Sequence, residues 1–194
     1  MTKTKVQLIL FTVVIMLLLM TACGKNKYDT TTSKEATAIC GSWAYNHDKE
    51  TVIAIFREDG TAQYEDKDYS FECDSQFIKL RNANGDTIQI RYLLDDEGMY
   101  LYSKNIYTFS GEGKPEGLVG EWSCAEKKWT FSFTDAGTFR EDGYFPGHYV
   151  IDDENSTVKL IYNDQFEDTV CYYQLEENKL TIEYPWRMVR INDQ

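Results

Sequence analysis

Histidine and proline are both scarce in this chain of 194 residues, which contains two histidines, His47 and His148, and three prolines. Two isolated histidines cannot build a His-rich metal site, and they leave no Ser/His/Asp set for nucleophilic catalysis. The chain also lacks a Cys-x-x-Cys pair, a phosphate-binding glycine loop and a Gly-x-Ser-x-Gly nucleophile motif. These absences predict a protein that is not an enzyme and that uses neither a metal nor another cofactor.

Basic residues are too few to balance the acids, because 20 Lys and Arg stand against 32 Asp and Glu, for a formal charge of −12. This sign argues against nucleic acid and anionic lipid surfaces as direct partners and favours cationic ones. The acidic runs at 65–68, 95–97, 152–154 and 176–177 lack the alternating spacing of a calcium loop. We therefore expect them to be solvated turn residues.

The longest apolar run lies at residues 6–20, after two lysines. About 15 apolar residues are short for a transmembrane helix, which needs about 20, but suit a signal peptide. The run ends in LMTACG at residues 19–24, which resembles a bacterial lipobox, whose cysteine is lipidated and becomes the mature N-terminus. We expect a signal peptide at 1–22 and a palmitate-type anchor on Cys23, which would hold the protein at the extracytoplasmic face of the cell membrane. An ordinary secretory peptide or an uncleaved anchor is the alternative.

The remaining chain contains one unit twice. A Gly-x-Trp motif is formed by Gly41 and Trp43 and again by Gly120 and Trp122. A Phe-x-x-x-Gly-Thr motif follows each of them, which indicates an internal duplication. Further matches pair residues 56–61 with 133–138, Tyr69 with Tyr149, residues 78–80 with 158–160, and residues 92–94 with 173–175.

Each copy alternates apolar and polar residues with a period of two and is rich in β-branched and aromatic residues, as strands are. No window after Cys23 has helical spacing. We therefore predict an all-β fold of two tandem antiparallel meander barrels, each with about eight short strands. The predicted order is a flexible tether at 23–38, a first barrel at 39–110, a linker at 111–118 and a second barrel at 119–194.

The repeated Gly-x-Trp and Phe-x-x-x-Gly-Thr motifs, with a late strand ending in basic and apolar residues, resemble the small lipocalin-like domains of bacterial lipoproteins. The resemblance implies that each indole packs beneath its barrel against an arginine of the last strand. In the second copy Arg187 or Arg190 would supply this arginine. The first copy departs from the pattern, since its last strand is preceded only by Lys104.

Strand length limits what such a domain can bind. Strands of about six residues are about 20 Å long, and an eight-stranded barrel of this size is largely filled by its own side chains. We therefore expect a cleft between the copies or a surface site rather than a deep cavity.

Four cysteines remain after lipidation, two in each copy. Export permits disulfides within the copies, Cys40 with Cys73 and Cys124 with Cys171. Buried thiols are the alternative, because the strand alternation points Cys124 and Cys171 inward.

The most unusual loop contains Tyr144, Phe145 and His148 around a Pro-Gly pair, and Tyr184 and Trp186 flank another proline. These aromatic residues are either a recognition site or a cap on the open end of the second barrel. The whole pattern predicts a non-enzymatic surface lipoprotein that binds an unidentified small ligand or partner protein. The alternatives are an acidic inhibitor or shield that captures a cationic protein or peptide, and a structural protein of the cell envelope.

Overall fold

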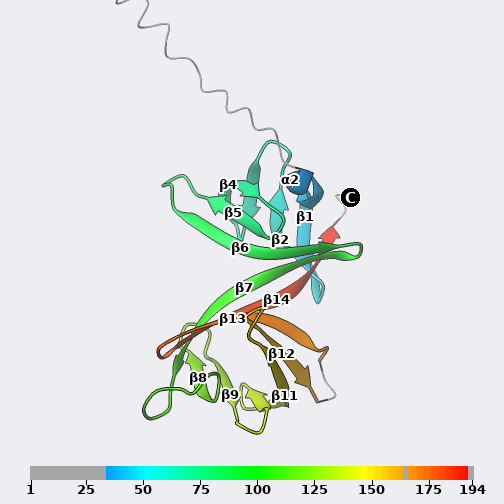
Figure 1. The fold of residues 1–194 in the computed structure, drawn as a ribbon. Helices are drawn as coiled ribbons and strands as arrows, with labels where there is room; N and C mark the ends of the chain where they lie inside the picture. Colours follow the sequence, from blue (N-terminus) through cyan, green and yellow to red (C-terminus); the bar gives the residue numbers. More distant parts are fainter. Residues whose placement is uncertain (1–33, 164–165, 192–194) are drawn as a thin grey trace, which may run out of the picture. The chain divides into compact units, whose positions relative to one another are not determined.

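The computed structural model describes residues 34–163 and 166–191, and this part of the chain is built almost entirely from antiparallel strands (Figure 1). The predicted all-β meander is confirmed. The predicted signal peptide at 1–22 and the lipidation site Cys23 lie outside the described residues. Within the described ranges no helix is long and apolar enough to cross a membrane.

The described chain begins with a short helix, α2 (Lys34–Ile39), which overlaps the end of the segment predicted to be a tether. Its sequence, KEATAI, consists largely of good helix formers. Ala36 and Ile39 lie three residues apart and are therefore on one face, where both are buried against the first core. The folded part thus starts earlier than predicted, because two apolar helical residues cover one side of that core.

Seven strands form from each copy in the described part of the chain. Their burial alternates along much of their length, as expected for strands with one face toward a core. The first copy supplies β1 (Gly41–Tyr45), β2 (Asp48–Phe56), β3 (Thr61–Tyr64), β4 (Lys67–Cys73), β5 (Phe77–Arg81), β6 (Thr87–Asp95) and β7 (Gly98–Phe109). The second supplies β8 (Gly120–Cys124), β9 (Trp129–Phe133), β10 (Thr138–Glu141), β11 (Phe145–Asp152), β12 (Thr157–Tyr162), β13 (Thr169–Glu176) and β14 (Lys179–Ile191).

Consecutive strands pair from β1 to β14, and β1 pairs with β14, so the sheet closes on itself. The two longest strands, β7 and β14, also pair with each other, from Met99 opposite Met188 to Thr108 opposite Lys179 (Figure 1). The structure therefore does not show the copies as separate barrels with eight strands each. They are joined in one sheet through their two last strands.

The buried side chains form two clusters, and each contains a residue from the other copy. The first core is formed by residues of α2 and of strands β1 to β7, and it also includes Met188 from β14. The second core is formed by Leu118 and by residues of strands from β8 to β14, and it also includes Tyr107 from β7. Burial of one such side chain stabilises a protein by about 1.5–3 kcal/mol. Each copy therefore completes the core of the other.

The two Gly-x-Trp motifs make the same hydrogen bond. The Nε1–H of Trp43 donates to the carbonyl oxygen of Ile39, and that of Trp122 to the carbonyl oxygen of Leu118, both at 2.8 Å. Both indoles are 1% exposed, so this bond satisfies a donor that would otherwise be buried without a partner. Leu118 is itself buried in the second core, so the predicted linker at 111–118 ends inside the folded structure.

The arginine expected beneath the second Trp packs in the first copy instead. The guanidinium of Arg190 lies 4.8 Å from the ring centre of Trp43 and donates to the carbonyl oxygen of Ala38 at 2.8 Å. Phe109 takes the corresponding place against Trp122, with ring centres 5.3 Å apart. This exchange follows from topology, because the end of β14 pairs with β1 and the end of β7 pairs with β8.

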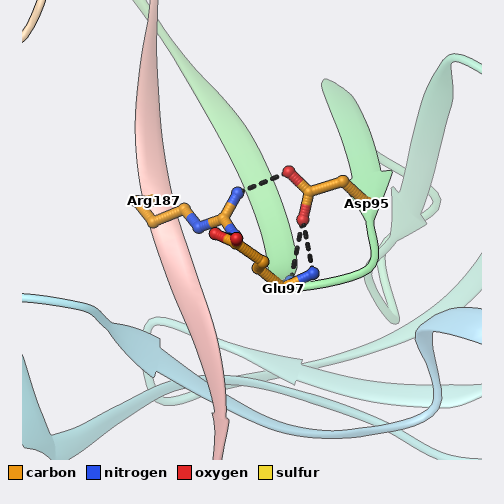
Figure 2. Close-up of polar contacts among 4 residues, drawn as sticks. Asp95, Glu97 and Arg187 are labelled. Carbon is orange, nitrogen blue, oxygen red and sulfur yellow. Dashed lines mark hydrogen bonds and ion pairs between the residues drawn. The ribbon is translucent and has the colours of Figure 1, made fainter.

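Arg187 also acts between the copies (Figure 2). Its Nη1 donates to Oδ2 of Asp95 at 2.6 Å, and its Nη2 lies 3.3 Å from Oε2 of Glu97, both in the hairpin between β6 and β7. Its guanidinium stacks 4.7 Å from the ring centre of Tyr100. Of the two arginines that the sequence offered for packing beneath a Trp, Arg187 instead contacts Tyr100 and the two acids of this hairpin.

The duplicated strands also differ in register from the prediction that matched Tyr69 with Tyr149. Ala62 lies opposite Tyr69 in the first copy, and Phe139 lies opposite Gly147 in the second. The residue equivalent to Tyr69 is therefore Gly147. In the first copy the small Ala62 lies opposite the large Tyr69, whereas in the second the large Phe139 lies opposite Gly147. A Cβ on Gly147 would lie 2.5 Å from the Phe139 ring, so only glycine fits there.

No disulfide joins the four cysteines in the described chain. Cys124 and Cys171 are buried in the second core, while Cys40 and Cys73 pack at the edge of the first.

The two motif glycines allow a matched test of packing. Gly41 and Gly120 share a positive φ, +135° and +127°, but a Cβ would lie 2.3 Å from the Phe109 ring at Gly120 and 3.6 Å from Arg190 at Gly41. We expect Gly120→Ala to lower the free energy of unfolding by about 1–3 kcal/mol more than Gly41→Ala, measured by denaturant titration. Adding Phe109→Leu to Gly120→Ala should recover part of the difference, and equal losses in the two single variants would contradict the steric explanation.

Candidate functional site

A cavity of about 250 Å³ lies beside the second core and is lined mainly by aromatic rings. Its residues come from β9, β10, β11, β12 and β14 and from the adjoining turns. We call it the aromatic–acid pocket. It is lined by Trp129, Glu141, Asp142, Phe145, Tyr162, Phe166, Tyr184 and Trp186.

Strand alternation explains how these side chains meet. Trp129, Glu141, Tyr162 and Tyr184 each lie two residues from a buried core residue of the same strand, and therefore on its inner face. The pocket thus continues the inner face of the sheet past the second core. The core residues in question are Phe131, Phe139, Leu160 and Ile182.

The rings of the pocket contact one another. Tyr184 and Trp186 have ring centres 5.4 Å apart, and Phe145 meets Phe166 edge to face at 5.0 Å. The first copy also contributes, because Tyr45 lies 5.8 Å from Trp186. One wall of the pocket is therefore supported by residues from the other half of the sheet.

Two partly buried carboxylates, those of Glu141 and Asp142, line the pocket together with these rings. The hydroxyl of Tyr162 donates a short hydrogen bond to Oε2 of Glu141, and the hydroxyl of Tyr184 lies 3.4 Å from that of Tyr162. Burial raises the pKa of Glu141, the Tyr162 hydrogen bond partly offsets this shift, and the charge of Asp142 adds to it. The Oδ1 of Asp142 accepts the backbone N–H of Thr130 at 2.7 Å.

This arrangement favours positive charge. Aromatic faces and carboxylates both attract cations, and the attraction increases where water is excluded. None of the residues that line the pocket in the described chain is basic. What the pocket can do chemically is hold an organic cation.

The first copy does not repeat this site. The backbone bond from Glu65 to Ile53 matches that from Asp142 to Thr130, so these turns are equivalent in the two copies. The preceding residues are then also equivalent, and the first copy has Tyr64 in place of Glu141 and Val52 in place of Trp129. The described residues of the first copy therefore lack both the acid and the tryptophan at the equivalent positions.

A second depression, of about 640 Å³, is lined by residues of both copies. It shares Phe166, Tyr184 and Trp186 with the aromatic–acid pocket, and its other lining residues include Tyr100, Tyr102 and Arg187. Arg187 is already paired with Asp95 and Glu97 (Figure 2). In the described chain the other charged residues that line this groove are exposed, so it is the weaker candidate.

Three of the five aromatic-loop residues identified in the sequence, Phe145, Tyr184 and Trp186, meet at the pocket. The other two, Tyr144 and His148, do not line it, and Tyr144 is 82% exposed. Sequence reasoning missed the other five lining residues, Trp129, Glu141, Asp142, Tyr162 and Phe166. The available signal was an acid at an inward position of β10, two residues after Phe139.

In the described chain no group of three or more His, Cys, Asp or Glu side chains is placed to hold a metal ion. Comparison with protein-family models, curated proteins and solved structures found no match. The function is therefore inferred from the pocket.

The raised pKa of Glu141 predicts a pH-dependent stability. The folded state holds the proton more tightly than the unfolded chain, so this contribution to stability is present below the unfolded-state pKa and is lost as pH rises through the folded-state pKa. We expect Glu141→Gln to become more stable relative to the wild type as pH rises from about 4 to about 7, in urea titrations. A stability difference between Glu141→Gln and the wild type that stays constant over this pH range would refute the assignment.

Proposed function

We propose that this protein is a membrane-tethered, non-enzymatic binding protein whose aromatic–acid pocket receives the cationic group of a small molecule or of a partner's side chain. The observation that carries the proposal is the partly buried carboxylate of Glu141, which lies with Asp142 and six aromatic side chains in a pocket whose lining, in the described chain, has no basic residue. A cation over such rings gains about 2 kcal/mol when it is desolvated.

The partly buried acid Glu141 supports a binding role for a further reason. An ionised carboxylate in a poorly solvated site is costly unless a positive charge compensates it. Tyr162 supplies a hydrogen bond but no charge. A bound cation would supply the missing charge, and the negative surface of the chain would attract cations toward it.

The same chemistry serves both functional alternatives that the sequence left open. A small organic cation and a basic side chain of a captured protein or peptide would each place one positive group against Glu141. The lipobox-like segment and the repeated Gly-x-Trp units support a lipoprotein with lipocalin-like domains, held by Cys23 at the outer face of the membrane.

Calorimetric titration of the full chain with a tetramethylammonium salt tests the pocket. We expect saturable binding that Glu141→Gln weakens by about tenfold or more, which corresponds to about 1.4 kcal/mol. Trp186→Ala should weaken it as well, since one aromatic wall is removed. Two exposed residues outside the pocket lining provide controls, and Tyr144→Ala and Glu121→Gln should bind as the wild type does. No binding by the wild type, or equal loss in controls and pocket variants, would rule the pocket out.

The lipid anchor predicts a separate result. Cys23→Ser should abolish incorporation of labelled palmitate and move the protein from the membrane fraction to the soluble fraction. Cys40→Ser serves as the matched control, because Cys40 belongs to the folded part, and it should leave both readouts unchanged. Continued labelling of Cys23→Ser would show that the anchor lies elsewhere.

A further inference from the structure

We infer that the cationic group received by the aromatic–acid pocket is a basic side chain of an extended polypeptide, whose backbone lies in the neighbouring groove. The groove is the depression of about 640 Å³ that residues of both copies line. This inference rests on the proposed function, namely that the pocket takes a cation, and it names the class of partner. It is carried by the shared lining of the two depressions, by their charge and by one unpaired strand edge.

The pocket and the groove have part of their lining in common. Phe166, Tyr184 and Trp186 line both, so the two depressions adjoin at these rings. The pocket has about 250 Å³, which is less than the volume of about 300–1,000 Å³ that sites for small molecules usually have. It therefore has room for the charged end of a ligand, and the rest of that ligand would lie in the groove.

The groove presents apolar surface that a small ion would leave uncovered. Leu93 of β6 is 53% exposed and Val170 of β13 is 45% exposed, and both line the groove together with the rings of Tyr100 and Tyr102. Each Å² of such surface removed from water contributes about 25 cal/mol. A polypeptide that continues from the pocket into the groove would gain this contribution, whereas a free ammonium ion would not.

The two depressions also have an acidic lining. In the described chain it contains five acids and only one arginine or lysine, Arg187, which is paired with Asp95 and Glu97 (Figure 2). Asp168 is paired with Lys159. Three acids of the lining have no ion-pair partner among the described residues, namely Glu141, Asp142 and Glu167. Both depressions would therefore attract a basic peptide.

Strand β14 leaves one stretch of its edge unpaired beside the groove. Its ladder with β13 ends at Glu183, and its ladder with β1 begins at Met188. In the described chain residues 184–187 therefore have a strand partner only on the β7 side. On the other side the carbonyl oxygen of Arg187 accepts the backbone N–H of Asn46 at 2.9 Å.

This edge offers a hydrogen-bond acceptor at Pro185, which lines the groove. Alternation along the strand directs the carbonyl oxygen of Pro185 to the same side as that of Arg187, two residues away. Proline has no N–H, so at this position the edge has an acceptor without a donor. A peptide backbone supplies the missing N–H, as it does when a peptide binds to the edge of a sheet. The groove thus suits a polypeptide backbone, as the pocket suits its basic side chain.

Calorimetric titrations of the full chain with three probes test the inference. The first probe is a blocked pentapeptide with lysine at its centre and alanine at the other positions. The second is a single blocked lysine, which has the same ammonium group with little further backbone. The third is the pentapeptide with uncharged norleucine in place of lysine. We expect the lysine pentapeptide to bind at least about tenfold more tightly than either of the other probes.

The outcomes distinguish the two claims. If the single blocked lysine binds as tightly as the lysine pentapeptide, the polypeptide inference is wrong while the cation pocket stands. If the norleucine pentapeptide binds as tightly as the lysine pentapeptide, or if none of the probes binds, the proposed cation-binding function fails and the inference fails with it.

Leu93→Arg tests the groove separately, because Leu93 lines the groove and not the pocket. A long side chain there should obstruct the peptide backbone, so the preference for the lysine pentapeptide over the single lysine should narrow several-fold. Both probes carry the same charge, which makes this ratio insensitive to the charge of the new arginine. Ile106→Arg is the matched control, since Ile106 is 54% exposed and lines neither depression, and it should leave the ratio unchanged. An unaltered ratio in Leu93→Arg would overturn the placement of the backbone in the groove.

Discussion

The pairing of β7 with β14 is the interaction on which the rest of the structure depends. These strands end the two copies, and their ladder runs from Met99 opposite Met188 to Thr108 opposite Lys179. Because β14 extends alongside the first copy and β7 alongside the second, Met188 contributes to the first core and Tyr107 to the second. Two small units with cores of limited size thereby share stabilisation that neither would have alone.

The same pairing organises the candidate site. Tyr184 and Trp186 lie on β14 where it leaves the second half, so they line the aromatic–acid pocket while Tyr45 of the first half packs against Trp186. Glu141 breaks the apolar pattern of the inner face, and such exceptions are expected where a protein serves function at a cost in stability. The first copy has Tyr64 at this place, which shows that the fold itself does not require the acid.

Most local features could be predicted from the sequence. The alternating runs became strands, and both Gly-x-Trp motifs adopt the same buried arrangement. The packing of Arg190 of the second copy against Trp43 of the first could not be predicted, because the two residues are far apart in sequence. The same holds for Phe109 at the end of the first copy, which packs against Trp122 of the second. The equivalence of Tyr69 with Gly147 was hidden for a related reason, since Phe139 fills the volume that the glycine leaves.

The sequence by itself determined the strand composition, the duplication, the acidic surface and the aromatic residues Phe145, Tyr184 and Trp186. These depend on local periodicity and composition, which a single chain displays directly. Only the tertiary structure decided which strand edges meet and which side chains surround Glu141. The physical reason is that backbone hydrogen bonds of a strand edge are nearly independent of sequence, so the partner is selected by packing across the whole sheet.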